Sequence, residues 1–230
     1  MSFNSILDND FYKFTMQYAV IKLYPDTVAC YEFINRGAHE FPEGFAEALR
    51  EKLNHMSELK LTSEERKYLD ETLPYLNSAY LDFLQGYRYD PSEVEIEQKG
   101  TELSVKIQGY WYRTILWEVP ILSWISELYY EMTQQQRGSD SEVVEIVKRK
   151  AQSYLELGVK VAEFGTRRRH SYEVHTIVAD ALKKYGGNSY VGTSNVHLAM
   201  KTGVKPIGTH AHEWFMYHGA RFGFKVANGI

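Results

Sequence analysis

The sequence predicts an α/β fold, with an α+β amino-terminal domain over residues 1–135 and the first part of a parallel α/β barrel over residues 141–230. Two patterns support this prediction. Polar and apolar residues alternate between Ser92 and Trp117, as they do in antiparallel strands. After residue 141, short apolar runs alternate with helical segments, which is typical of parallel strands joined by crossover helices. The polar stretch from Thr133 to Asp140 lies between the two patterns and is expected to be a linker or exposed loop.

The chain is expected to open with a helix and a strand. Apolar residues recur at helical spacing from Asp10 to Leu23, so a helix is predicted there, with Asn9 or Asp8 as its cap. Residues 27–35 are rich in β-formers, and this short segment predicts a strand.

Further elements of the amino-terminal domain follow from local signals. A helix is expected over residues 44–56, and another is expected to start near Thr62, which has capping-box spacing to Glu65. The alternating segments on either side of Gly100 predict a hairpin or meander. An apolar helix is then predicted from Val119 to Met132.

The second part of the chain is expected to start with a helix from Ser141 to Leu157. Apolar runs then end in the same local pattern at three points: Phe164-Gly165-Thr166, Val191-Gly192-Thr193 and Ile207-Gly208-Thr209. Each pattern taken singly is also common where a strand ends before a helix cap. Three in succession indicate a ligand site, because ligands bind at the carboxyl ends of parallel barrel strands. A closed barrel needs roughly 250 residues, so the barrel is expected to be incomplete or the chain a fragment.

Composition excludes several classes of protein. The formal net charge of −4 argues against general nucleic-acid binding, which requires an excess of basic residues. Cys30 is the single cysteine, so neither an internal disulfide nor a cysteine zinc site is expected, and a cytoplasmic location is predicted. No secretory signal and no apolar run long enough to cross a membrane are visible.

A basic cluster lies just before a predicted amphipathic helix. Arg167, Arg168 and Arg169 stand at the helix amino terminus, where cations are unfavourable unless an anion binds there too. Guanidinium groups and helix N–H groups both bind phosphate, so a phosphate site is predicted. The alternative is a solvated basic patch or a set of ion pairs with distant acids.

Two further groups of residues are candidates for binding or catalysis. Thr193, Ser194 and Asn195 predict either a helix cap or a ligand contact, and the two roles are compatible. His210 and His212 predict either a metal site or a catalytic nucleophile, because imidazole is largely neutral near physiological pH. The metal alternative has no accompanying carboxylate or cysteine motif, so no protein metal site is predicted.

Five motifs together resemble the nicotinate phosphoribosyltransferase family. They occur in the family's order and with similar spacing, and they are residues 10–17, 115–120, 164–169, 191–195 and 208–214. Any one of them is unspecific, whereas five in order are specific to this family, and they extend over nearly all of the chain.

The resemblance implies a type II phosphoribosyltransferase fold and a reaction. Nicotinate would be joined to 5-phosphoribosyl 1-diphosphate, giving nicotinate mononucleotide for NAD biosynthesis or salvage. ATP hydrolysis would be coupled to this reaction through a phosphohistidine, which the match of residues 211–214 assigns to His212. Mg²⁺ would be held mainly by diphosphate and ATP oxygens.

The resemblance also implies roles for binding residues in a homodimer with shared active sites. Tyr12 would stack on the nicotinate ring across the dimer interface, with Asp10 beside it, and Thr209 would contact nicotinate. The arginines from Arg167 to Arg169 would lie near phosphate and carboxylate groups.

The sequence leaves other classes of function open. A quinolinate or nicotinamide phosphoribosyltransferase is the second enzyme class, and a nucleotide-binding or subunit-interaction fragment is the non-enzyme reading. RNA binding through the arginine cluster is disfavoured by the net charge. Because the family's barrel continues beyond this length, the 230-residue chain alone is expected to be catalytically weak or inactive.

Overall fold

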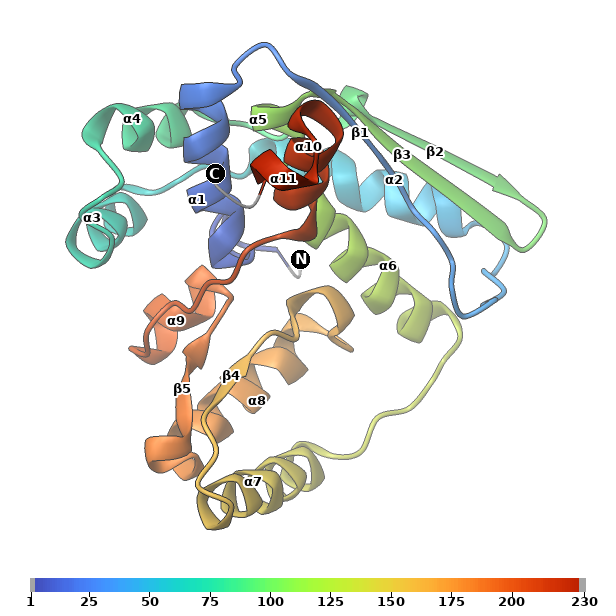
Figure 1. Ribbon diagram of the computed structural model, residues 1–230. Coiled ribbons are helices and arrows are strands. Elements are labelled where there is room, and N and C mark those ends of the chain that lie inside the picture. The colour runs from blue at the N-terminus through green and yellow to red at the C-terminus, as the bar shows by residue number, and fades with distance from the viewer. Residues whose placement is uncertain (1–2, 228–230) are drawn as a thin grey trace.

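The computed structural model describes residues 3–227 and has two parts joined by an exposed linker (Figure 1). The amino-terminal part contains, in order, α1 (Phe11–Leu23), β1 (Val28–Glu32), α2 (Phe45–His55), α3 (Ser63–Thr72), α4 (Ser78–Gly86), β2 (Val94–Lys99), β3 (Glu102–Tyr110), α5 (Trp111–Thr114) and α6 (Glu118–Met132). The second part contains α7 (Asp140–Glu156), β4 (Val161–Glu163), the 3-10 turn η3 (Thr166–Arg168), α8 (Tyr172–Tyr185), the 3-10 turn η4 (Gly187–Ser189), β5 (Tyr190–Thr193), α9 (Val196–Thr202), α10 (His212–Phe222) and α11 (Phe224–Ala227).

The antiparallel sheet of the amino-terminal part confirms the predicted hairpin. Its strand order is β1-β3-β2, with Val94 opposite Ile107 and Val28 opposite Tyr110. Apolar residues on one face of β2 and β3 are buried, and α2 packs against β2. The chain leaves the sheet at Trp111, where the short helix α5 begins, so the strands end earlier than Trp117.

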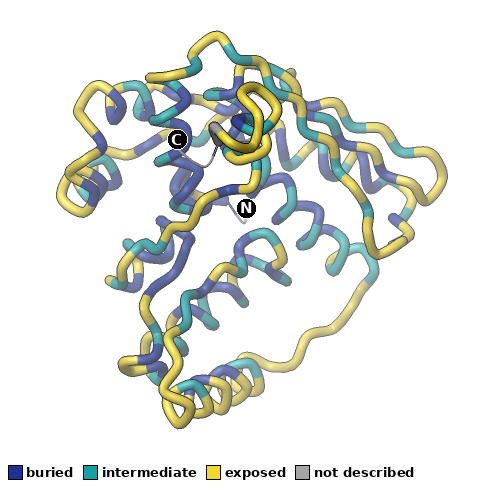
Figure 2. Tube along the Cα trace, viewed as in Figure 1, coloured by how far each residue is buried: buried dark blue, intermediate teal, exposed yellow. Residues whose placement is uncertain are grey.

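Helix α1 is the central helix of the amino-terminal part and is largely buried (Figure 2). Its predicted extent is confirmed, but its predicted cap is wrong. The N-cap residue is Asp10, and its side chain makes no capping hydrogen bond. The Asp10 carboxylate instead accepts hydrogen bonds from Ser194 and Tyr12, so a tertiary contact has replaced the local one.

Capping boxes define the start of two other helices. The predicted box of Thr62 and Glu65 is present at α3. A second box, formed by Ser139 and Glu142, starts α7 directly after the linker, whose residues are exposed as predicted. These side chains satisfy backbone N–H groups that the first helical turn leaves unpaired.

Strands β4 and β5 form a parallel pair, and α8 makes the crossover between them, as predicted. The third predicted strand end, at residues 207–209, is wrong, because no strand precedes it. The chain makes only an isolated parallel bridge between Thr193 and Pro206. In this bridge the Thr193 N–H donates to the Lys205 carbonyl and the Thr193 carbonyl accepts from the Ile207 N–H, and the pairing extends no further.

Helix α10 packs against the amino-terminal part. Its Trp214 and Tyr217 lie against Trp111, and its His218 is 2.9 Å from the Tyr24 hydroxyl. Val196 and Ala211 of the second part therefore belong to the main hydrophobic core, whereas Tyr172, Ala179 and Leu198 form a smaller cluster of their own. No helix within residues 3–227 has the length and apolar character needed to cross a membrane.

Candidate active site

The carboxyl end of β5 holds the start of α1 in place. Phe11 donates its backbone N–H to the carbonyl of Ser194 (2.7 Å), and the Ser194 hydroxyl donates to Asp10 (2.7 Å). Thr193, Ser194 and Asn195 are all fully buried. The strand ends and the amino terminus of α1, far apart in the sequence, are thus brought together.

The Asp10 carboxyl lies in this buried junction. The Tyr12 hydroxyl donates to it at 3.2 Å, and burial raises the pKa of Asp10 despite the hydrogen bond from Ser194. The Tyr12 ring is itself buried within this chain. Its stacking on a ligand bound to a second subunit stays a prediction.

The polar residues after β5 are bonded to protein groups. The Thr193 hydroxyl donates to Glu163 (2.6 Å), and the same carboxylate lies 2.9 Å from Nε2 of His175. Asn195 accepts a hydrogen bond from the N–H of Leu198 and is the N-cap of α9. The capping role is confirmed, and the predicted ligand contacts stay predictions.

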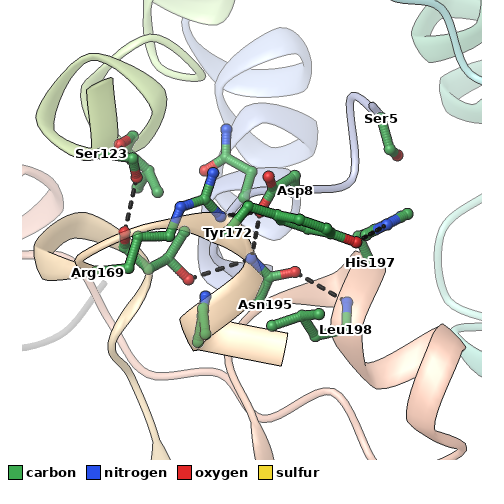
Figure 3. A network of polar contacts seen from close by, with 12 residues as sticks. Ser5, Asp8, Ser123, Arg169, Tyr172, Asn195, His197 and Leu198 are labelled. Atoms are coloured by element: carbon green, nitrogen blue, oxygen red, sulfur yellow. Dashed lines mark hydrogen bonds and ion pairs between the residues drawn. The ribbon is translucent and has the colours of Figure 1, made fainter. Parts of the chain in front are cut away.

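The three arginines do not act as one cluster. Arg169 is fully buried between Asp8 (2.8 Å) and Glu127 (2.6 Å), and Figure 3 shows Asp8 between Arg169 and Asn195. Arg169 is therefore engaged within the protein and is not presented to a ligand, because its charge is matched by acids from distant segments. Arg168 is exposed. Arg167 is half-exposed; burial acts to lower the pKa of its guanidinium group, but the nearby carboxylates of Glu118 and Asp10 help to raise it.

His212 is the first residue of α10 and is exposed. Its neighbour Glu213 is anchored by Lys13, whose ammonium group lies 2.8 Å from Glu213 and 2.5 Å from Glu118. The other Glu118 oxygen accepts a hydrogen bond from Arg167 at 3.0 Å. A chain of alternating charges thus links the helix that carries His212 to the half-exposed arginine.

Burial and neighbouring charges shift the pKa values of these linked ionisable groups to different extents. Burial acts against the charged form of Lys13, but Glu213 and Glu118 outweigh it and raise the pKa of the lysine. Burial raises the pKa of Glu213, which Lys13 offsets only in part. Burial acts in the same direction on Glu118, but there Lys13 and Arg167 prevail and lower its pKa. Glu118 is therefore the more firmly ionised of the two carboxylates.

The loop before α10 runs close to the start of α1. A Cβ atom at Gly208 would lie 2.7 Å from the Phe11 ring, so a larger residue there would force the ring to move. Thr209 and His210 follow it and are exposed. No group of three or more His, Cys, Asp or Glu side chains suited to a metal ion occurs among residues 3–227.

Replacing Glu118 with glutamine (E118Q) is expected to lower the free energy of unfolding by about 2 kcal/mol at pH 7, because two cations lose a charged acceptor. The folded-state pKa of Glu118 lies below its ordinary value of 4.5. Its contribution is therefore complete above pH 4.5 and is lost as the pH falls through the folded-state pKa. Urea unfolding at pH values decreasing from 7 should show the difference between the two proteins shrinking only below pH 4.5, with the exposed Glu97 as a control (E97Q). A difference that grows as the pH falls contradicts this expectation.

Sequence reasoning missed several residues of this site. Lys13 and Glu213 lie within two of the family motifs, but their pairing depends on tertiary structure.

Comparison with known proteins identifies the family. Residues 7–126 match the family model of the nicotinate phosphoribosyltransferase N-terminal domain, and residues 159–223 match that of the nicotinate phosphoribosyltransferase family. The chain belongs to the nicotinate phosphoribosyltransferase family. The resemblance inferred from the five motifs is therefore confirmed.

Relatives and solved structures agree with this membership. The chain is 58% identical to a nicotinate phosphoribosyltransferase of Chromohalobacter salexigens and 48% identical to one of Desulforapulum autotrophicum, over 99% and 97% of its length. It spans only 58% of the length of each relative. The crystal structure of nicotinate phosphoribosyltransferase from Porphyromonas gingivalis superimposes with a TM-score of 0.94 at 45% identity, covering 99% of this chain and 58% of that one. The chain thus has the fold of the matching part of these phosphoribosyltransferases.

Proposed function

We propose that the chain forms part of an enzyme that transfers the phosphoribosyl group of 5-phosphoribosyl 1-diphosphate to nicotinate in NAD biosynthesis or salvage. The observation that carries this proposal is the position of Arg167, a half-exposed cation beside Asp10 at the carboxyl ends of β4 and β5. Nicotinate and phosphoribosyl diphosphate are both anions, and a guanidinium group pairs well with carboxylate and phosphate. The names of the relatives support the same substrates.

In the transfer step, the pyridine nitrogen of nicotinate attacks the anomeric carbon of the ribose as the bond to diphosphate breaks. Arg167 would hold an anionic group of a substrate, and the exposed Arg168 would add positive charge nearby. Thr209, on the exposed loop beside Phe11, would contact nicotinate. Tyr12, Asp10, Thr193, Ser194 and Asn195 would shape the floor of the site, and a homodimer would share two such sites.

We further propose that His212 accepts the γ-phosphoryl group of ATP. A ring nitrogen attacks the phosphorus, the bond to ADP breaks, and water later releases phosphate. His212 is exposed, and it stands at the start of an eleven-residue helix whose N-cap residue, Ala211, has no side-chain oxygen to cap it. The positive end of a helix favours an added negative charge, which supports this role. When bound with ATP and diphosphate, Mg²⁺ would stabilise the leaving groups, and its ligands would be their oxygens.

Nicotinate-dependent ATP hydrolysis tests the proposal. The 230-residue chain is expected to form little nicotinate mononucleotide alone, because it spans 58% of its relatives' length. Co-expressed with the remaining part of the C. salexigens enzyme, it is expected to form product and to hydrolyse ATP only when nicotinate is present. The same activity with quinolinate, without ATP consumption, would favour the quinolinate alternative and refute the proposal.

A further inference from the structure

Glu163, the last residue of β4, is a buried acid that the proposed reaction does not use. Its carboxylate accepts hydrogen bonds from the backbone N–H of Gly165 and from the hydroxyl of Thr193 (2.6 Å). The same carboxylate lies 2.9 Å from Nε2 of His175. All three side chains, of Glu163, Thr193 and His175, are buried. One carboxylate therefore joins three segments, which are the turn after β4, the end of β5 and helix α8.

The bond to Gly165 shapes the turn that carries Arg167. Gly165 accepts the backbone N–H of Arg168 at 2.9 Å, and this bond closes the 3-10 turn η3. A Cβ atom at Gly165 would lie 2.6 Å from the Glu163 carboxylate, so a larger residue there would push the carboxylate away. Arg167 lies within this turn, and the direction of its side chain therefore depends on how the turn is held.

The remaining bonds of Glu163 fix the end of β5, which holds Asp10. The hydroxyl of Thr193 donates to the Glu163 side chain, and the backbone carbonyl of Glu163 accepts the N–H of Ser194 at 2.8 Å. Ser194 in turn donates its hydroxyl to Asp10. Glu163 thus joins the two strand ends on which the positions of Arg167 and Asp10 depend.

His175 orients this carboxylate from helix α8. An ionised carboxylate only accepts hydrogen bonds, so the ring nitrogen that lies 2.9 Å from it carries a proton. Burial acts to raise the pKa of Glu163, but His175, Thr193 and Gly165 outweigh it and lower the pKa, so the carboxylate is ionised at neutral pH. A buried charge is stable only while it is paired and hydrogen-bonded, so loss of His175 should loosen both the carboxylate and the turn.

The contacts of Glu163 leave neither carboxylate oxygen for a substrate. Oε1 is bonded to Gly165, and Oε2 is bonded to Thr193 and faces His175. The residue is also only 9% exposed. Any effect of Glu163 and His175 on the reaction is therefore exerted through the residues that they hold.

We infer that Glu163 and His175 are positioning residues, which hold the turn η3 so that Arg167 is aimed at the anionic group of its substrate. The role of Arg167 in this inference rests on the proposed function. A misplaced guanidinium group weakens substrate binding but takes no part in breaking the bond to diphosphate. Loss of the pair should therefore raise KM and leave kcat nearly unchanged.

Kinetics of three variants test this role in the complex with the remaining part of the C. salexigens enzyme. H175L removes the N–H donor and should raise KM for nicotinate or phosphoribosyl diphosphate at least about tenfold, with kcat within about threefold. H175Q places an amide N–H near the position of Nε2 and should restore most of the loss. V147A removes buried methyl groups from α7, so it is the control for destabilisation alone, and its KM values should stay within about twofold of wild type.

A double-mutant cycle shows whether His175 acts through Arg167. If it does, H175L/R167Q should have the same KM values as R167Q alone, because the arginine that His175 positions is already absent. Effects of the two substitutions that multiply independently would overturn the inference.

Amide exchange in the 230-residue chain tests the turn without any activity. Exchange at Gly165 and Arg168 should be at least about tenfold faster in H175L than in V147A, because their N–H groups close the turn. Equal exchange in these two variants would overturn the inference, as would equal KM values in an active complex. A wild-type complex that makes no product would refute the proposed reaction, and exchange would then decide the role of the pair by itself.

Discussion

Replacing Arg169 with leucine (R169L) is expected to lower the free energy of unfolding by about 4 kcal/mol. The guanidinium group is almost inaccessible to solvent, and so are its partners Asp8 and Glu127. Burial alone would lower the pKa of Arg169, but the two carboxylates outweigh this and raise it. Removing the cation leaves two buried carboxylates without the positive charge that balances them, and breaking a buried pair in this way costs roughly 3–5 kcal/mol. The Phe3 ring, 4.5 Å from the guanidinium carbon, also loses its cation contact.

The adjacent arginine provides the control. Arg168 is exposed, so R168L should change the free energy of unfolding by less than about 0.5 kcal/mol. Urea unfolding at pH 7, followed by circular dichroism, measures both variants. If R169L were as stable as R168L, the ion pairs of Arg169 would not hold the amino terminus to the second part of the chain.

Replacing Lys13 with methionine (K13M) is expected to lower the free energy of unfolding by about 3 kcal/mol. The lysine side chain is fully buried, and its ammonium group is shared by two carboxylates from distant helices. Without it, Glu118 and Glu213 repel each other across a partly buried space, although Arg167 still neutralises Glu118. The first turn of α10, and His212 with it, should become mobile.

Two variants make this expectation specific to the ion pairs. Lys22 lies near the end of the same helix, is exposed and has no acidic partner in the described residues, so K22M should be close to wild type. The double variant K13M/E213Q should recover part of the loss, because one of the opposed charges is removed. Thermal unfolding measures stability, and amide exchange at residues 213–216 reports on the helix start. A K13M protein with wild-type stability and exchange would contradict the assignment.

The sequence allowed good predictions where the deciding interactions were local. Capping boxes, the alternation of the hairpin and the spacing of α1 and α8 all lie within a few residues, and the corresponding elements were found. The parallel arrangement of β4 and β5 also followed from the order of elements. The third predicted strand end was wrong, because the chain there makes only a single bridge to β5, between Thr193 and Pro206.

The roles of charged residues were harder to predict. The three arginines are consecutive in sequence but have different surroundings. Arg167 pairs with Glu118, Arg168 is exposed, and Arg169 is buried and paired with acidic residues far away in the sequence. A helix with polar residues at i, i+3 and i+7 ordinarily presents them to solvent, whereas Asp10, Lys13 and Gln17 are all buried. Their partners come from α4, α5, α6, α10 and the residue after β5, and no pattern within α1 identifies them.

We propose that the loop and helix from Gly208 to Trp214 present His212 for phosphorylation. Mass spectrometry after incubation with ATP and Mg²⁺, on the chain co-expressed with the unmatched part of its relative, tests this most directly. The expected result is an acid-labile phosphate on the peptide that contains His212, retained in H210N and absent in H212N. A phosphate that persists in H212N, or no phosphate in a complex that forms nicotinate mononucleotide, would contradict it.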